Sequence, residues 1–124
     1  GQLPSGEKVI DIVKKYKNNN WVGIIMACIS PGAYGMVIND LKKLDIPYGF
    51  KLNAFKKIPE GYTVASKDEW GNAGNPTTVL GKNTDLNESK FYEYVNKFMK
   101  NGATILGGCC EIRPSHIKEI SKLK

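Results

Sequence analysis

The segment "ATILGGCCEIRPSHI", residues 103–117, sets two adjacent cysteines between an apolar run and a proline. The run "ATILGG" has the length and character of a buried strand, and Pro114 is typical of a first helical position. Side chains alternate between the faces of a strand, so Cys109 and Cys110 can face a common target only where the chain bends. The two glycines before them make a bend sterically cheap. The segment therefore predicts a strand, a thiol-bearing turn and a terminal helix.

Apolar residues recur at helical spacing in three further stretches, which lie at residues 9–16, 31–44 and 88–101. Ser5 is expected to cap the first of these helices, and Ser30 followed by Pro31 is expected to open the second. Gly102 is placed to stop the third. The aromatic residues of the third stretch have the spacing of a face that packs against a sheet.

Two more apolar segments have strand length. "WVGIIMAC", residues 21–28, is continuously apolar, as is typical of a strand buried on both faces of a parallel sheet. "YGFKLNAF", residues 48–55, alternates and predicts a second strand that ends near Asn53. Residues 56–87 have little periodicity and are expected to form an active-site loop or an irregular excursion. Helices that alternate with buried strands predict an α/β fold with a parallel sheet.

The three cysteines of the chain all fall at predicted strand ends. In parallel α/β folds, ligands bind beyond the carboxyl ends of the strands, where Cys28, Cys109 and Cys110 would meet. Three thiolates suit a soft or borderline metal such as zinc, and they leave a fourth tetrahedral position open. Two other interpretations stay open from the residues alone. The cysteines are small buried hydrophobes, or the adjacent pair is a redox couple, which its tight ring disfavours.

The composition narrows the class of protein. With 124 residues, 41% of them hydrophobic, the chain suits one small domain. The net charge of +6 comes from lysine, and Arg113 is the only arginine, which favours a solvated surface over a nucleic-acid partner. There is no apolar run of about 18 residues, and the start "GQLPSGEK" lacks the pattern of a signal peptide. We therefore expect no membrane association, a cytoplasmic location and reduced thiols.

The segment "GGCCEIRPSHI" resembles the carboxyl-terminal signature of the zinc-dependent homocysteine S-methyltransferase family: Gly-Gly-Cys-Cys, a short turn, Pro, any residue and His-Ile. "VGIIMACISP" is similar to an earlier motif of that family, in which a strand ends in Asn-Cys before Ser-Pro; here Ala27 replaces the asparagine. "YGFKLNAF" is similar to a strand that ends in Tyr-Pro-Asn, with Lys51 and Leu52 in place of Tyr-Pro and Asn53 as the asparagine. The resemblance spans nearly the whole chain.

This resemblance implies a fold and a set of site residues. Residues 1–124 would form a single partial homocysteine-binding domain, namely the last three βα units of a (β/α)8 TIM barrel whose amino-terminal half is absent. A complete barrel takes about 250 residues. The resemblance also implies that zinc is bound by Cys28, Cys109 and Cys110. Asn53 is a candidate for orienting substrate, and for His116 we favour a supporting role over zinc ligation.

The reaction implied by the resemblance is zinc-dependent methyl transfer from a sulfonium or ammonium donor to the thiol of homocysteine, which gives methionine. Candidate donors are S-methylmethionine, S-adenosylmethionine, betaine and dimethylsulfoniopropionate. We expect activity to require the missing half, supplied by a separate chain or by self-association. The alternative is a catalytically inactive fragment that binds zinc or serves as an interaction module.

Overall fold

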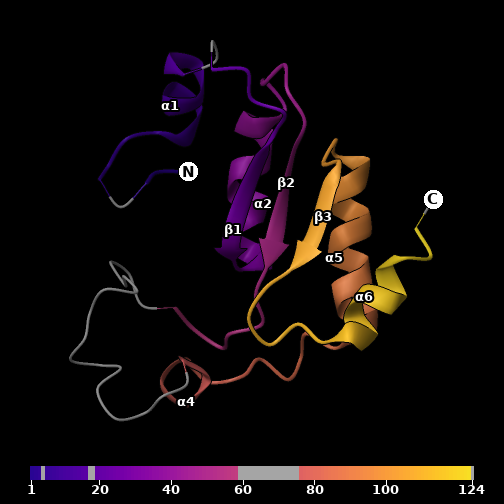
Figure 1. Cartoon of the computed structure of the whole chain (residues 1–124). Helices are drawn as coiled ribbons and strands as arrows, with labels where there is room; N and C mark the ends of the chain where they lie inside the picture. The colour runs from indigo at the N-terminus through magenta and orange to yellow at the C-terminus, as the bar shows by residue number, and fades with distance from the viewer. Residues whose placement is uncertain (4, 17–18, 59–75, 124) are drawn as a thin grey trace.

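The computed structural model describes residues 1–3, 5–16, 19–58 and 76–123. The elements in chain order are α1 (Val9–Lys15), β1 (Ile24–Ile29), α2 (Pro31–Leu41), β2 (Tyr48–Leu52), α4 (Pro76–Leu80), α5 (Glu88–Lys100), β3 (Ile105–Gly108) and α6 (Pro114–Ile120). The three strands form one parallel sheet in the order β1-β2-β3 (Figure 1). The predicted parallel α/β arrangement is confirmed.

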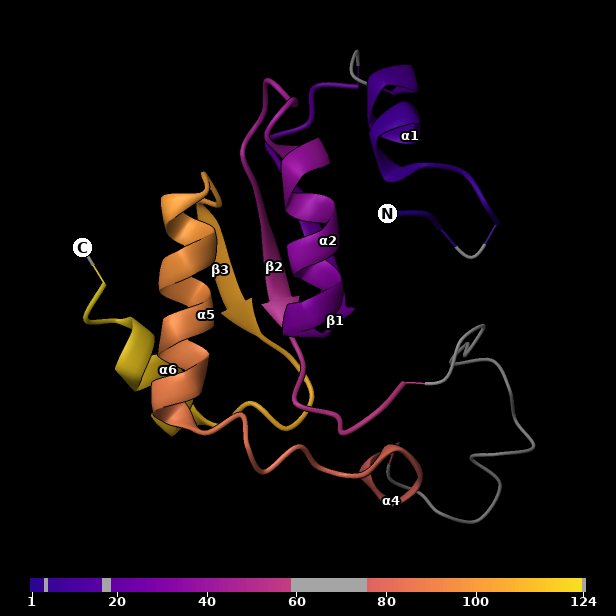
Figure 2. The ribbon, with the colours of Figure 1, turned by 180° about the vertical axis from the view of Figure 1, so that it is seen from behind.

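Helices α2 and α5 cover one face of this sheet, and α6 lies beside α5 (Figure 2). The contact is made by three buried aromatic rings, one each from α2, β2 and α5. The Tyr34 ring lies 4.8 Å from the rings of both Phe50 and Phe98, in edge-on geometry. Such pairs add specific geometry to the burial of large apolar surfaces. The predicted packing of the 88–101 helix against the sheet is confirmed.

The other face of the sheet carries no helix from the described residues (Figure 1). For this reason the prediction that residues 21–28 form a strand buried on both faces is wrong. Ile25 on this helix-free face is 46% exposed, and Ala27 on the same face is exposed as well. Met26, which alternates with them, packs against the core. One face of β1 is therefore apolar, like a buried surface, although none of the described helices covers it.

The helix ends agree with the sequence signals at Ser30-Pro31, at Gly102 and at Pro114, which begins α6 as predicted, and they differ at Ser5. The Ser30 hydroxyl accepts a hydrogen bond from a backbone N–H in the first turn of α2 at 3.2 Å, and Pro31 begins that helix. Gly102 follows α5 with a φ of +97°. The Ser5 prediction is wrong: α1 begins only at Val9, and the Ser5 hydroxyl donates instead to the Glu7 carboxylate at 2.8 Å.

Among the described residues of the region expected to be irregular there is a short helix, α4, which lies beyond the carboxyl ends of the strands (Figure 1). The chain returns toward the sheet through an antiparallel bridge between Phe55 and Lys82. Residues 59–75 of this region fall outside the described part of the chain. None of the helices in the described ranges has the length and apolar character needed to cross a bilayer.

Candidate metal centre

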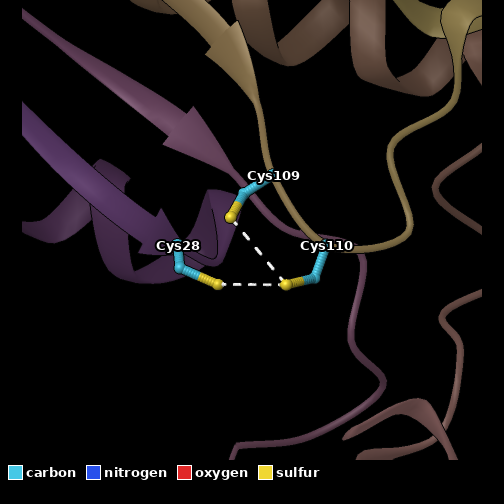
Figure 3. A group of neighbouring side chains, drawn as sticks. All are labelled: Cys28, Cys109 and Cys110. Carbon is cyan, nitrogen blue, oxygen red and sulfur yellow. Dashed lines mark hydrogen bonds between the residues drawn. The ribbon is translucent and has the colours of Figure 1, made fainter. Parts of the chain in front are cut away.

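Three thiols from distant parts of the sequence meet at the carboxyl ends of the strands. The Cys28 thiol, near the end of β1, donates to the sulfur of Cys110 at 3.7 Å, and the sulfurs of Cys109 and Cys110 lie 3.8 Å apart (Figure 3). All three sulfur atoms lie within 4.8 Å of one another. A disulfide would require about 2.05 Å, so the adjacent pair is reduced in this structure. The predicted convergence of the three cysteines is confirmed.

Cys28 reaches this position because β1 is distorted where it occurs. The register of β1 against β2 shifts between Ala27 and Ile29, and Cys28 itself has a φ of +50°. Such a bulge re-aims a side chain at the end of a strand. Left-handed backbone conformation is unfavourable for a residue with a Cβ, so the surrounding structure must hold it.

Asn53 supplies that support. Its side chain is buried, with 1% of the residue exposed, and its Nδ2 donates to the Cys28 carbonyl at 2.6 Å. Its Oδ1 accepts from the Phe55 backbone N–H at 3.3 Å. Nδ2 also donates to the Cys28 sulfur at 3.8 Å, so the amide contacts the backbone on both sides and the thiol itself. The role of orienting substrate stays a prediction for this residue.

The Cys109-Cys110 turn is held by the backbone of the neighbouring strand. The Cys109 N–H donates to the Leu52 carbonyl at 2.7 Å, and the Cys110 carbonyl accepts from the Ala54 N–H at 2.9 Å. The bend itself comes after the pair, at Glu111, which has a φ of +62°. Of the two preceding glycines, Gly108 has a steric task, since a Cβ there would collide with the Ile112 side chain.

Glu111 connects the turn after the cysteine pair to α4, in the region that was expected to be irregular. The sequence signals did not reveal this link. The Glu111 carboxylate accepts from the Thr77 hydroxyl at 2.6 Å and from the Arg113 guanidinium at 3.1 Å, and the side chain is 12% exposed. The hydrogen bond from Thr77 is the main cause that lowers the pKa of Glu111. Glu111 could have been singled out from the sequence because it directly follows the cysteine pair, but no feature of the sequence pointed to Thr77.

His116 uses both ring nitrogens away from the thiols. Its Nδ1 accepts from the Arg113 N–H at 3.2 Å, and its Nε2 lies 3.0 Å from the Leu86 carbonyl. Because Nδ1 is an acceptor, the proton of the neutral ring is on Nε2, which donates to Leu86. The ring packs edge-on against Phe91 with centroids 5.5 Å apart. His116 joins the start of α6 to the segment before α5, in agreement with a supporting role.

The three thiols ionise unequally. Burial raises the pKa of the Cys28 thiol to about 12, and its two cysteine neighbours act in the same direction. Burial is also the main cause that raises the pKa of Cys110. For Cys109 burial raises the pKa, but hydrogen bonds from the other two cysteines and the positive charge of Lys51 outweigh it, so the pKa is lowered. Cys109 is therefore the first of the three to become a thiolate.

The dimensions of the cluster fit a tetrahedral metal ion. A zinc–sulfur bond of about 2.3 Å and tetrahedral angles place two bound sulfurs about 3.8 Å apart. The separations of Cys110 from Cys28 and from Cys109, 3.7 and 3.8 Å, match this value, and the third pair of sulfurs lies within 4.8 Å. Three thiols could hold a metal ion here and leave its fourth position open.

Comparison with known proteins gives the same direction as the geometry. The family profile described as Homocysteine S-methyltransferase matches residues 1–123. Homocysteine S-methyltransferase 2 of Zea mays is 37% identical over 124 residues, which cover 97% of this chain and 32% of the maize protein. Homocysteine S-methyltransferase 3 of Zea mays is 37% identical over 122 residues, or 95% and 31% of the two chains. Selenocysteine methyltransferase of Astragalus bisulcatus is 37% identical over 43 residues, covering 35% and 13%. The chain spans about a third of the length of the maize relatives.

Proposed function

Because this chain belongs to the homocysteine S-methyltransferase family, we propose that it provides the zinc site for methyl transfer to the thiol of homocysteine, which forms methionine. The methyl donor is a sulfonium or ammonium compound. The observation that carries the proposal is the meeting of three thiols beyond the carboxyl ends of parallel strands, all within 4.8 Å of one another and two pairs at the 3.7 to 3.8 Å spacing of a tetrahedral metal site.

The chain matches about a third of the maize relative, and we propose that its three parallel strands are part of a larger TIM barrel. We propose that residues 1–124 form a single partial homocysteine-binding barrel domain. The helix-free face of the sheet would then face the barrel interior, since helices surround the strands of such a barrel on the outside. A groove of about 720 Å³ runs along β1, lined by residues that include Val13, Trp21 and Ile25, and it would be covered by the preceding units.

The residues of the cluster have separate tasks in this proposal. Cys28, Cys109 and Cys110 bind the metal as thiolates. Bound zinc would hold the sulfur of homocysteine as a thiolate at neutral pH, which makes it a nucleophile. The Asn53 side chain keeps the carbonyl of Cys28, and with it the bulge, in place. Glu111 holds the turn after the pair through its hydrogen bond from Thr77.

The reaction itself is a displacement at carbon. The homocysteine thiol loses its proton to solvent, and its sulfur forms a bond to the donor methyl carbon. The bond between that carbon and the donor sulfur or nitrogen breaks, and the electron pair stays with the donor. Alignment of the two reactants can lower the activation barrier by about 7 to 11 kcal/mol. The candidate donors are S-methylmethionine, S-adenosylmethionine, betaine and dimethylsulfoniopropionate.

The proposed zinc site is tested by metal stoichiometry. Wild type and the variants Cys28→Ala, Cys109→Ala and Cys110→Ala are loaded with zinc, dialysed and assayed with a chromogenic chelator. We expect one zinc per chain in the wild type and a loss of tight binding in each variant, because two thiolates leave the ion under-coordinated. Ser89→Ala, an exposed substitution on α5, is the control. Full binding by Cys28→Ala would contradict the three-thiolate site.

A second candidate is a fragment that binds zinc or a partner and does not catalyse. The observation that favours it is the share of the relatives covered, about a third. Methionine formation is measured with each donor, with and without the part of the maize relative that this chain does not match. Activity only in the combined sample supports the proposed enzyme function and shows that the rest of the barrel is required. Zinc binding without activity in either sample supports the second candidate.

A further inference from the structure

Lys51 lies on the helix-free face of the sheet, at the level of the last residues of the strands. In the register of the sheet it is flanked by Ala27 of β1 and Gly107 of β3. Its side chain crosses Gly107, with Cγ 3.7 Å from the point that a Cβ on this glycine would occupy. Because Ala27 and Gly107 are small, Lys51 has the largest side chain of these three paired residues.

Cys109 belongs to the same face as Lys51. It follows Gly107 by two residues, and its N–H continues the ladder to the Leu52 carbonyl at 2.7 Å. Residues two apart along an extended ladder share a face, so the side chains of Lys51 and Cys109 leave the backbone on the same side of the sheet.

No carboxylate of the described residues forms an ion pair with Lys51. The acidic group of the cysteine turn, Glu111, is already engaged by Thr77 and Arg113. Lysine is almost never buried without a partner, because an unpaired charge away from water is costly. When the helix-free face is enclosed in a barrel, the Lys51 ammonium therefore needs an anionic partner close to the thiols.

We propose that Lys51 binds the carboxylate of the thiol substrate and makes the site selective for thiols that carry an anionic group. The inference rests on the proposed function, since it places the substrate sulfur at the open position beside the three thiolates. Lys51 would be a specificity-determining contact and takes no part in the bond changes.

The test compares two thiols of similar length on the Co²⁺-loaded chain, because a thiolate bound to Co²⁺ gives a charge-transfer absorbance. The probes are 4-mercaptobutyrate, which has a carboxylate, and 1-butanethiol, which does not. We expect the wild type to bind 4-mercaptobutyrate ~2- to 5-fold more tightly, the range of an exposed ion pair. The preference should shrink in 1 M salt. It should vanish in Lys51→Met and persist in Lys51→Arg and in the control Lys56→Met.

The outcomes separate this inference from the proposed function. If Co²⁺ does not bind to the wild type, the three-thiolate site is wrong and the inference fails with it. If Co²⁺ binds but the two thiols bind equally, or neither binds, the inference fails and the metal site stands. A preference that persists in Lys51→Met also overturns it. Equal Co²⁺ stoichiometry in wild type and variants shows that the substitutions leave the thiol cluster folded.

Discussion

Replacement of Asn53 by alanine should weaken both the fold and the metal site, although Asn53 contributes no metal ligand. The side chain is 1% exposed and joins two backbone groups, the Cys28 carbonyl at 2.6 Å and the Phe55 N–H at 3.3 Å. In Asn53→Ala both groups lose their partner in a place that water reaches poorly. The perturbation therefore acts on the bulge that aims the Cys28 thiol.

The magnitude follows from the two hydrogen bonds lost to the backbone, since the third, from Nδ2 to the Cys28 sulfur, is long at 3.8 Å. A buried polar group left without a partner costs about 1 to 3 kcal/mol. The hydrogen bond to the Cys28 carbonyl is short, at 2.6 Å, so its loss should cost an energy near the upper end of this range. The hydrogen bond from the Phe55 N–H is long, at 3.3 Å, so its loss should cost an energy near the lower end. We expect the free energy of unfolding to fall by about 2 to 4 kcal/mol. Loss of a residue that supports a metal ligand typically lowers metal affinity by about 10- to 100-fold.

Two assays measure these effects. Urea denaturation of the metal-free chain gives the change in the free energy of unfolding, and competition with a chelator gives the Co²⁺ affinity. Asn39→Ala is the matched control, since Asn39 is exposed on α2 and alanine is at least as good a helix former. The control should keep the wild-type stability and affinity.

The result also distinguishes two roles for Asn53. If the residue served only to orient substrate, Asn53→Ala would keep the wild-type stability and Co²⁺ affinity and would lose affinity for the thiol probe alone. That outcome would refute the argument that the amide holds the Cys28 bulge.

Three further predictions concern other parts of the chain. His116→Phe keeps the packing on Phe91 but removes both ring hydrogen bonds, so urea denaturation should show a loss of about 1 to 3 kcal/mol; unchanged stability would contradict the proposed link. Tyr34→Phe should keep or raise the stability by up to about 1 kcal/mol, because its buried hydroxyl has no partner among the described residues; a clear loss would mean that the hydroxyl is satisfied. Zinc occupancy should fall as the pH drops from about 8 to 5, since protons compete for thiols such as Cys28, whose pKa burial raises to about 12; occupancy that is independent of pH would argue against thiolate ligands.

The order of helices and strands follows from local signals in the sequence. Alternation in residues 48–52, the Ser30-Pro31 start and the glycine after α5 each act through the conformation of a few neighbouring residues, and the structure has these elements as predicted. The carboxyl ends of parallel strands share one edge, so the placement of all three cysteines at strand ends also predicted their meeting.

Other features depend on contacts between distant parts of the chain. Continuous apolar sequence in residues 21–28 predicted burial on both faces, but burial depends on which elements cover a sheet, and the described helices cover only one face. The link between Thr77 and Glu111 joins residues 34 positions apart that have no shared local pattern.

The sequence by itself determined the fold class, the family and the three thiols of the candidate site, because these depend on residue types at fixed spacing. Only the tertiary structure decided how the thiols are aimed. The left-handed backbone at Cys28 is unfavourable on its own and is held by Asn53, the residue that follows β2, through a hydrogen bond to its carbonyl. The face shared by Lys51 and Cys109 was likewise decided by strand register, which depends on pairing between segments more than fifty residues apart along the chain.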